Sequence, residues 1–141
     1  MSDLGLLRQF LRLEITQDFD GIMETHSKYN SYLLINFNID DFKATHFSFL
    51  SGINLEEGNT TPQVDSTLYR QLIGSLIHLI HSRSEICYVV NAISRYMQQP
   101  HELYWREAKR ILQYVQGTRS YGIHLYAADS KLDLVGFTES D

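Results

Sequence analysis

A helical spacing of apolar side chains, repeated three times between residues 69 and 117, constrains the fold more than any other feature of the sequence. Side chains that recur every three or four residues lie on one face of a helix, and an apolar face has to be buried. Asp65 or Ser66 can cap the first helix. Ser84 is a plausible cap for the second, which Pro100 ends. The stretch therefore predicts three helices that pack on one another. Their apolar stripes consist of Leu68, Tyr69, Leu72, Ile73, Leu76, Ile77 and Ile80, then Ile86, Val89, Val90, Ile93 and Met97, and then Tyr104, Ala108, Ile111, Leu112 and Val115.

The third helix has a basic side. It begins just after Pro100 and ends at Gly117, the residue type favoured at a helix C-terminus. Its solvated side places basic residues beside Trp105 and Tyr114, and such a mixture of charge and aromatic surface can follow a nucleic-acid backbone. An ordinary solvated helix face with one buried tryptophan is the alternative. Two further arginines extend the patch if the helices pack side by side. The candidate nucleic-acid-binding residues are Arg95, Arg106, Lys109, Arg110 and Arg119.

The first forty residues predict a β-hairpin followed by a helix. Leu11, Leu13 and Ile15 alternate with polar residues, which is the pattern of a half-buried strand. Residues 18–21, Asp-Phe-Asp-Gly, supply a turn before a second strand. Ser27 can cap the helix that follows. One face of this helix is formed by Tyr29, Tyr32, Leu33, Asn36 and Phe37.

The remaining segments predict a loop and a pair of strands. Residues 40–65 combine glycine, proline and asparagine without a sustained period, which indicates a long loop. Residues 121–126 have strand character, and residues 129–131 can turn the chain back into a second strand over residues 132–137. The sequence thus predicts an α+β fold with an N-terminal β-hairpin, a helix, a long loop, three helices and a C-terminal strand pair.

Charge is divided unevenly along the chain. A net charge of −5 argues against nucleic-acid binding over the whole surface, because phosphate binding relies on clusters of Lys and Arg. Residues 70–119 hold seven Lys or Arg against three acids, whereas residues 1–65 hold four against ten. We therefore expect only the central helices to present a basic face.

Cysteine usage and hydropathy bear on location. Cys87 is the single cysteine, which excludes an internal disulfide, and its place on the apolar side of a helix predicts a small buried side chain. The sequence contains no run of about 18 apolar residues and no secretory leader. These features favour an intracellular, reducing location.

Short motifs follow one another in a fixed order through the helical stretch and beyond it. They are YRQLIGSL from Tyr69, Ser94-Arg95-Tyr96-Met97 with Pro100 and Trp105, Ala108-Lys109-Arg110-Ile111-Leu112, and Gly117-Thr118. In order and spacing they resemble the polymerase-to-ribonuclease H connection of copia-type LTR retrotransposon Pol polyproteins. The resemblance continues upstream and downstream and covers nearly the whole chain. It is carried there by Gly5, Phe10-Leu11, Gly21-Ile22, Lys28-Tyr29 and Leu134-Val135-Gly136-Phe137.

The resemblance implies a fragment of a reverse transcriptase. Its parts would be the end of the palm and a thumb helix at 1–39, a linker at 40–65, a helical thumb and connection segment at 66–120, and the first strands of a truncated ribonuclease H domain at 121–141. Magnesium serves the complete enzyme, whereas the fragment is expected to hold no cofactor and to have no turnover, because the polymerase aspartates would precede residue 1. The implied partners are an RNA or DNA duplex and the remainder of the polyprotein, with no membrane and no small-molecule substrate.

Five positions either depart from the family pattern or invite comparison with its metal ligands. Arg12 stands where the family usually has glycine, in the hairpin that supports the primer strand. Asp40 and Asp41 are adjacent, as in a two-magnesium site, but they follow a helix end, which favours a solvated acidic turn. Glu139 and Asp141 match acidic positions of the first ribonuclease H strand. A plain acidic tail is the alternative there.

The histidines do not predict a metal site. His78 and His81 lie three residues apart, with Glu85 four further on, which is a partial metal face. A turn separates Glu85 from the pair, so ordinary exposed or amphipathic histidines are the preferred interpretation. The sequence therefore predicts no catalytic residue and no metal ligand. A noncatalytic nucleic-acid-binding module and a helical protein-interaction domain remain as alternatives to an inert polymerase fragment.

Overall fold

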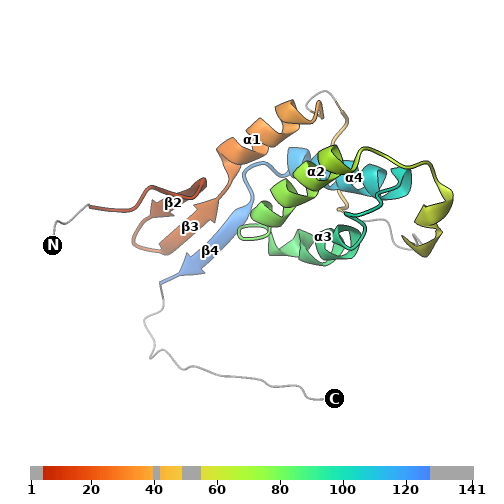
Figure 1. The fold of residues 1–141 in the computed structure, drawn as a ribbon. Helices are drawn as coiled ribbons and strands as arrows, with labels where there is room; N and C mark the ends of the chain where they lie inside the picture. The colour runs from red at the N-terminus through yellow and green to blue at the C-terminus, as the bar shows by residue number, and fades with distance from the viewer. Residues whose placement is uncertain (1–4, 40–41, 49–54, 128–141) are drawn as a thin grey trace, which may run out of the picture.

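The computed structural model of the chain describes residues 5–39, 42–48 and 55–127, and these combine a four-stranded sheet with helices (Figure 1). This mixture agrees with the predicted α+β class. The paired aspartates at 40–41, the strand predicted over residues 132–137, and Glu139 and Asp141 all lie outside the described residues.

The sheet joins the two ends of the described chain. Its strands, in spatial order, are β1 (Gln9–Phe10), β2 (Leu13–Gln17), β3 (Gly21–Thr25) and β4 (Gly122–Tyr126), and all neighbours are antiparallel. The predicted hairpin is formed by β2 and β3, but Leu11, which was predicted in its first strand, lies in the turn between β1 and β2. At its turn the carboxylate of Asp18 accepts hydrogen bonds of 3.0 Å from the amides of Asp20 and Gly21. The pairing of β4 with β3 was not anticipated from the sequence, which predicted β4 only as one of a C-terminal strand pair.

Two glycines permit the close approach of β3 and β4. Gly21 has a φ of +149°, and a Cβ at this position would lie 2.0 Å from the carbonyl oxygen of Leu125. A Cβ at Gly122 would lie 2.1 Å from the carbonyl oxygen of Glu24. The glycine that the sequence assigned to a turn therefore also admits the last strand to the sheet.

Helix α1 (Ser27–Asn36) follows the sheet directly. Its N-cap is His26, so the predicted cap at Ser27 is wrong by one residue. The carboxylate of Glu14, on β2, accepts a hydrogen bond of 2.7 Å from the amide of Lys28. A carboxylate at a helix start satisfies an otherwise unpaired amide and opposes the positive end of the helix dipole. A residue of the neighbouring strand thus accepts the hydrogen bond at the start of α1 that Ser27 was expected to accept.

The three predicted helices are α2 (Ser66–Leu79), α3 (Cys87–Ser94) and α4 (Glu102–Gly117). Asp65 caps α2 as predicted, and its carboxylate accepts hydrogen bonds from two amides of the first turn. The predicted cap at Ser84 is wrong, because Ser84–Ile86 form a 3₁₀ turn, η2, before α3 begins. A hydrogen bond of 3.2 Å from the Ile86 amide to the Arg83 carbonyl closes this tighter turn, and both side chains are buried.

The core lies among the four α-helices and is built mainly from the apolar stripes that the sequence predicted, with Leu34, Ile39 and Leu79 added, which the prediction did not include. Leu68 and Ile77 are exceptions, since 44% and 41% of their surfaces are exposed. Cys87 is half-buried rather than buried, and its sulfur accepts a hydrogen bond from Asn91. Within the described part of the chain, no helix has both the length and the apolar character needed to cross a membrane. The fully buried core side chains include Leu34, Tyr69, Leu72, Ile73, Leu76, Leu79, Ile86, Val90, Ile93, Tyr104, Ile111, Leu112 and Val115.

The described part of the predicted loop packs against α4. It contains a 3₁₀ helix, η1 (Leu55–Thr60), and residues 62–64 are hydrogen-bonded through their backbone to residues 100–102. A Cβ at Gly58 would lie 2.3 Å from the ring of Tyr104, so only glycine fits there. The hydroxyl of Tyr104 donates to the carbonyl of Leu55 at 3.0 Å, which ties η1 to α4.

Arg83 is a buried cation that anchors η2 to the end of α4. Its side chain is 1% exposed, and its Nε donates to the Glu85 carboxylate at 2.6 Å. The other guanidinium nitrogens donate to the carbonyl and the hydroxyl of Thr118, at 3.1 and 2.6 Å. The rings of Tyr114 and Tyr121 lie 5.3 and 5.7 Å from its Cζ. Since Thr118 is the C-cap of α4, the cation lies at the negative end of that helix.

Candidate nucleic-acid interface

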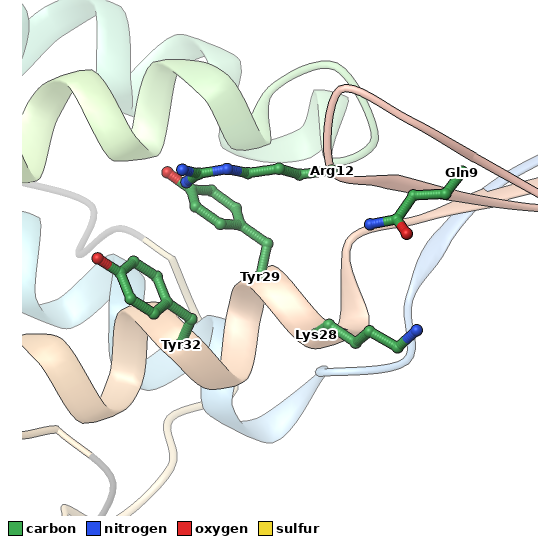
Figure 2. Close-up of a pocket in the computed structure, with 5 residues that line it drawn as sticks. All are labelled: Gln9, Arg12, Lys28, Tyr29 and Tyr32. Atoms are coloured by element: carbon green, nitrogen blue, oxygen red, sulfur yellow. The ribbon is translucent and has the colours of Figure 1, made fainter.

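A groove of about 310 Å³ lies between the β1–β2 turn and α1 (Figure 2). Two cations, two tyrosines and one glutamine line it. The rings of Tyr29 and Tyr32 are stacked, with centroids 6.2 Å apart and planes inclined by 18°. Tyr29 is nearly buried at 7% exposure, whereas Tyr32 is 56% exposed. The groove therefore presents one aromatic face to solvent. We call it the Arg12–Tyr32 groove, and its lining residues are Gln9, Arg12, Lys28, Tyr29 and Tyr32.

Arg12 extends to Tyr29 and ends beside the hydroxyl end of its ring, as Figure 2 shows. Its Cζ lies 5.0 Å from the ring centroid of Tyr29 and 5.9 Å from that of Tyr32, within the range of cation–π attraction. The backbone φ is 71° at Arg12 and 47° at Leu11, so both residues occupy the left-handed region that favours glycine. A backbone suited to glycine thus carries a planar cation at this position.

The buried side of Tyr29 is held by histidines. Its ring contacts His78 edge-on at 5.0 Å between centroids and His26 at 5.8 Å. His26 is fully buried, and its Nδ1 is hydrogen-bonded to the Ser82 hydroxyl. Burial, followed by the nearby His78 and His81, lowers the pKa of His26 to about 4. Burial is also the largest cause of the lowered pKa of His78. His26 is therefore neutral at pH 7 and can be buried beneath Tyr29 without carrying a charge.

A second cavity, of about 370 Å³, continues the groove along α1 toward α2. It is lined by the same arginine and both tyrosines, and Asn36, Gln71 and Ser75 add amide and hydroxyl groups. Hydrogen-bonding side chains from two helices therefore border the exposed ring of Tyr32.

The predicted basic residues occupy α4 and the ends of two helices. Arg106 is exposed on α4, and Arg95 is exposed at the C-cap of α3. Lys109 is half-buried, and its Nζ lies 5.1 Å from the ring centroid of Trp105, which pairs charge with an aromatic surface as expected. Arg119 is half-buried in the segment after α4, and its carbonyl accepts a hydrogen bond from Asn30.

Arg110 departs from the prediction that it lies on the solvated side. Its side chain is 26% exposed, and its Nε lies 3.8 Å from the carboxylate of Glu107. Glu107 is 1% exposed, and burial raises its pKa against the opposing influence of Arg110 and Arg106. Because a buried carboxylate is costly without a nearby cation, Arg110 has a structural partner inside the protein.

The spacing of His78, His81 and Glu85, which was considered from the sequence as a partial metal face and not favoured, does not give a three-residue cluster. The rings of His78 and His81 are 6.1 Å apart, and the Glu85 carboxylate is bound by Arg83. Nowhere in residues 5–39, 42–48 and 55–127 do three or more His, Cys, Asp or Glu side chains gather where a metal ion could be held.

Sequence reasoning missed the Arg12–Tyr32 groove because it assigned the basic surface to the central helices alone. Arg12 and Lys28 belong to the acidic first part of the chain, and the fold brings them together beside the tyrosines. Two signals were present in the sequence. Tyr29 and Tyr32 are three residues apart on a helix, and Arg12 stands where the family resemblance led us to expect glycine.

Comparison of the sequence with known proteins shows which family the chain resembles. The retrovirus-related Pol polyprotein from transposon RE2 of Arabidopsis thaliana is 32% identical over 137 residues, which make up 96% of this chain and 9% of that protein. The Pol polyprotein from transposon RE1 of the same plant is 31% identical over 141 residues, or 100% of this chain and 10% of that protein. This chain belongs to the copia-type retrotransposon Pol polyproteins. The Pol-family resemblance seen in the sequence motifs is thereby confirmed.

A shorter relative lies outside the Pol polyproteins by name. An uncharacterized mitochondrial protein of Arabidopsis thaliana is 30% identical over 141 residues, which are 100% of this chain and 58% of that protein. The Pol-family chain thus spans less than two thirds of the length of each of these relatives. No protein-family model matches it, and no solved structure does.

Proposed function

We propose that this chain is the nucleic-acid-holding part of a reverse transcriptase within a copia-type Pol polyprotein. The β1–β2 turn and α1 hold the primer–template duplex, and the helices of residues 66–120 support them. The magnesium-binding carboxylates of the complete enzyme lie elsewhere in the polyprotein. The described carboxylates of this chain do not form a metal cluster, so no chemical step is assigned to them.

The observation that carries this proposal is the combination of two cations with two stacked tyrosines in the Arg12–Tyr32 groove. Arg and Lys side chains supply the phosphate contacts that dominate nucleic-acid affinity. Arg12 and Lys28 are both exposed and can approach a backbone. The net charge of −5 restricts such binding to local basic sites, which is what a groove of this kind provides.

The basic side of α4 provides a second contact in the same proposal. Arg106 is free to approach phosphates from an exposed position, and Lys109 lies over Trp105. Arg95, at the C-cap of α3, and Arg119, after the end of α4, are further candidates for this contact. Arg110 contributes less because of its position beside buried Glu107.

The test is fluorescence anisotropy with a labelled RNA–DNA hybrid duplex, measured across a salt series. The groove variant carries Arg12→Gln with Lys28→Gln. Each lost phosphate contact reduces the log–log salt slope by about 0.9, so the slope should become shallower by about 2. We expect the affinity at low salt to fall about tenfold.

A control variant of equal charge separates the groove from general electrostatics. Arg8→Gln with Lys43→Gln removes two exposed cations outside the groove and should leave the slope close to that of the parent. Equal losses in the two variants, or a parent chain that does not bind the hybrid, would contradict the proposal. Magnesium-dependent nucleotide incorporation by the chain alone, above a mock preparation, would contradict the noncatalytic role.

A protein-interaction role with the remainder of the polyprotein is the second candidate, and one face of the sheet favours it. Strand register places Phe10, Ile22 and Leu125 on this face with Ile15 and Ile123. The first three are 56%, 37% and 51% exposed. Exposed apolar surface of this kind is typical of interfaces. Light scattering with the adjoining Pol segment added in trans tests it, and the absence of a complex at micromolar concentration would count against it.

A further inference from the structure

Duplex binding does not explain why the aromatic ring of Tyr32 is exposed. In a duplex the π-faces of the bases are stacked on one another, so only phosphates, sugars and base edges remain accessible. Arg12 and Lys28 suffice for phosphates, whereas a tyrosine with 56% of its surface exposed, beside two adjoining cavities, suits a flat apolar ligand. The bases of unpaired nucleotides present such faces.

The size of the groove agrees with a single base. At about 310 Å³ it lies at the lower end of the range for small-molecule sites, and the exposed ring of Tyr32 gives it a flat surface. Tyr29 is fixed beneath by His78 and His26, so the surface is supported from behind. An aromatic platform held in place in advance loses little entropy when a ligand stacks on it.

The groups around the platform match the other parts of a nucleotide. The guanidinium of Arg12 is planar and can stack as well as pair with a phosphate. Figure 2 shows Lys28 directed away from the rings, where it can meet the phosphate of a neighbouring nucleotide. Asn36, Gln71 and Ser75 line the adjoining cavity with donors and acceptors that suit the exposed edge of an unpaired base.

We propose that the Arg12–Tyr32 groove binds an unpaired nucleotide, with its base stacked on Tyr32, at the point where single-stranded nucleic acid leaves a duplex. This inference rests on the proposed nucleic-acid-holding function and adds the structural class of the ligand. The single-stranded segment gives affinity through stacking, so the groove has little dependence on base sequence.

The experiment compares three labelled probes on the full chain: a blunt hybrid duplex, the same duplex with an eight-nucleotide single-stranded overhang, and the overhang alone. We expect the overhang to raise the affinity of the duplex about tenfold. A 2-aminopurine placed in the overhang reports stacking directly, because its fluorescence is quenched when it stacks.

Two variants and a matched control decide the role of the ring. Tyr32→Ala should abolish the advantage of the overhang and the quenching, whereas Tyr32→Phe should keep both. Tyr88→Ala removes another tyrosine, 78% exposed on α3, and should change neither. Circular dichroism melting verifies that each variant is folded.

The outcomes separate this inference from the proposed function. If blunt and overhanging duplexes bind equally and Tyr32→Ala changes nothing, the unpaired-base site is refuted while nucleic-acid holding stands. If no probe binds, both are refuted.

Discussion

Replacing Arg12 with glycine separates what its backbone contributes from what its side chain contributes. The φ of 71° costs an L-residue about 1–2 kcal/mol, and glycine removes that cost. Glycine also gives the unfolded chain more conformational freedom, which destabilises the folded state by about 0.5–1 kcal/mol. The lost contact of the guanidinium with two rings, at 5.0 and 5.9 Å, removes about 0.5–1 kcal/mol. The free energy of unfolding of Arg12→Gly should therefore lie within about 1 kcal/mol of that of the parent.

Arg12→Ala is the matched comparison, because it loses the same side chain and keeps the strained backbone. It should be less stable than Arg12→Gly by about 0.5–1 kcal/mol, as measured by urea unfolding followed by circular dichroism. Both variants lack the guanidinium, so both should lose the same amount of nucleic-acid affinity. If Arg12→Ala proves as stable as Arg12→Gly, the reasoning about the left-handed turn is refuted.

The other predictions concern stability. The pKa of His26 is lowered from its ordinary value of 6.5 to about 4. The contribution of His26 to the free energy of unfolding is therefore complete above pH 6.5 and is lost as the pH falls toward 4. The unfolding free energy of the parent minus that of His26→Gln should fall by about 2 kcal/mol between pH 7.5 and 4.5, and a difference independent of pH would contradict this. Gly58→Ala forces a methyl group against a buried ring and should cost about 1–3 kcal/mol in thermal unfolding, whereas Gly74→Ala, in open space on α2, should stabilise by about 0.5–1 kcal/mol. Arg83→Met should lower the free energy of unfolding by about 2–3 kcal/mol because the Thr118 carbonyl loses a charged donor. Arg83→Lys should not restore this stability, since an ammonium cannot reproduce the guanidinium fork that reaches both oxygens of Thr118. Restored stability in Arg83→Lys would show that charge alone suffices.

The helices were predictable from the sequence because their determinants are local. The spacing of apolar residues sets the buried face of α2 and α4, and Asp65 lies next to the amides that it caps. The cap of α1 was misplaced because the carboxylate that accepts a hydrogen bond from its first turn belongs to Glu14, thirteen positions before Ser27. No local pattern reports a partner of that kind.

The sheet and the candidate site depend on contacts between distant segments. The pairing of β3 with β4 rests on two glycines whose role shows only when the strands meet. The Arg12–Tyr32 groove collects residues from a turn and a helix, and its continuation includes Gln71 on α2. Composition averaged over the acidic first part of the chain concealed this local basic site.

The pairing of β3 with β4 also sets the moment at which the sheet can be completed. Thr25 and Gly122 are register partners, so the ribosome must add about a hundred residues, at roughly 5–20 per second, between them. During those seconds the hairpin that carries Arg12 has an open edge, which is a template for any other strand. Synthesis therefore completes the sheet late, and a nascent chain stalled before β4 carries Arg12 beside a sheet that lacks its last strand.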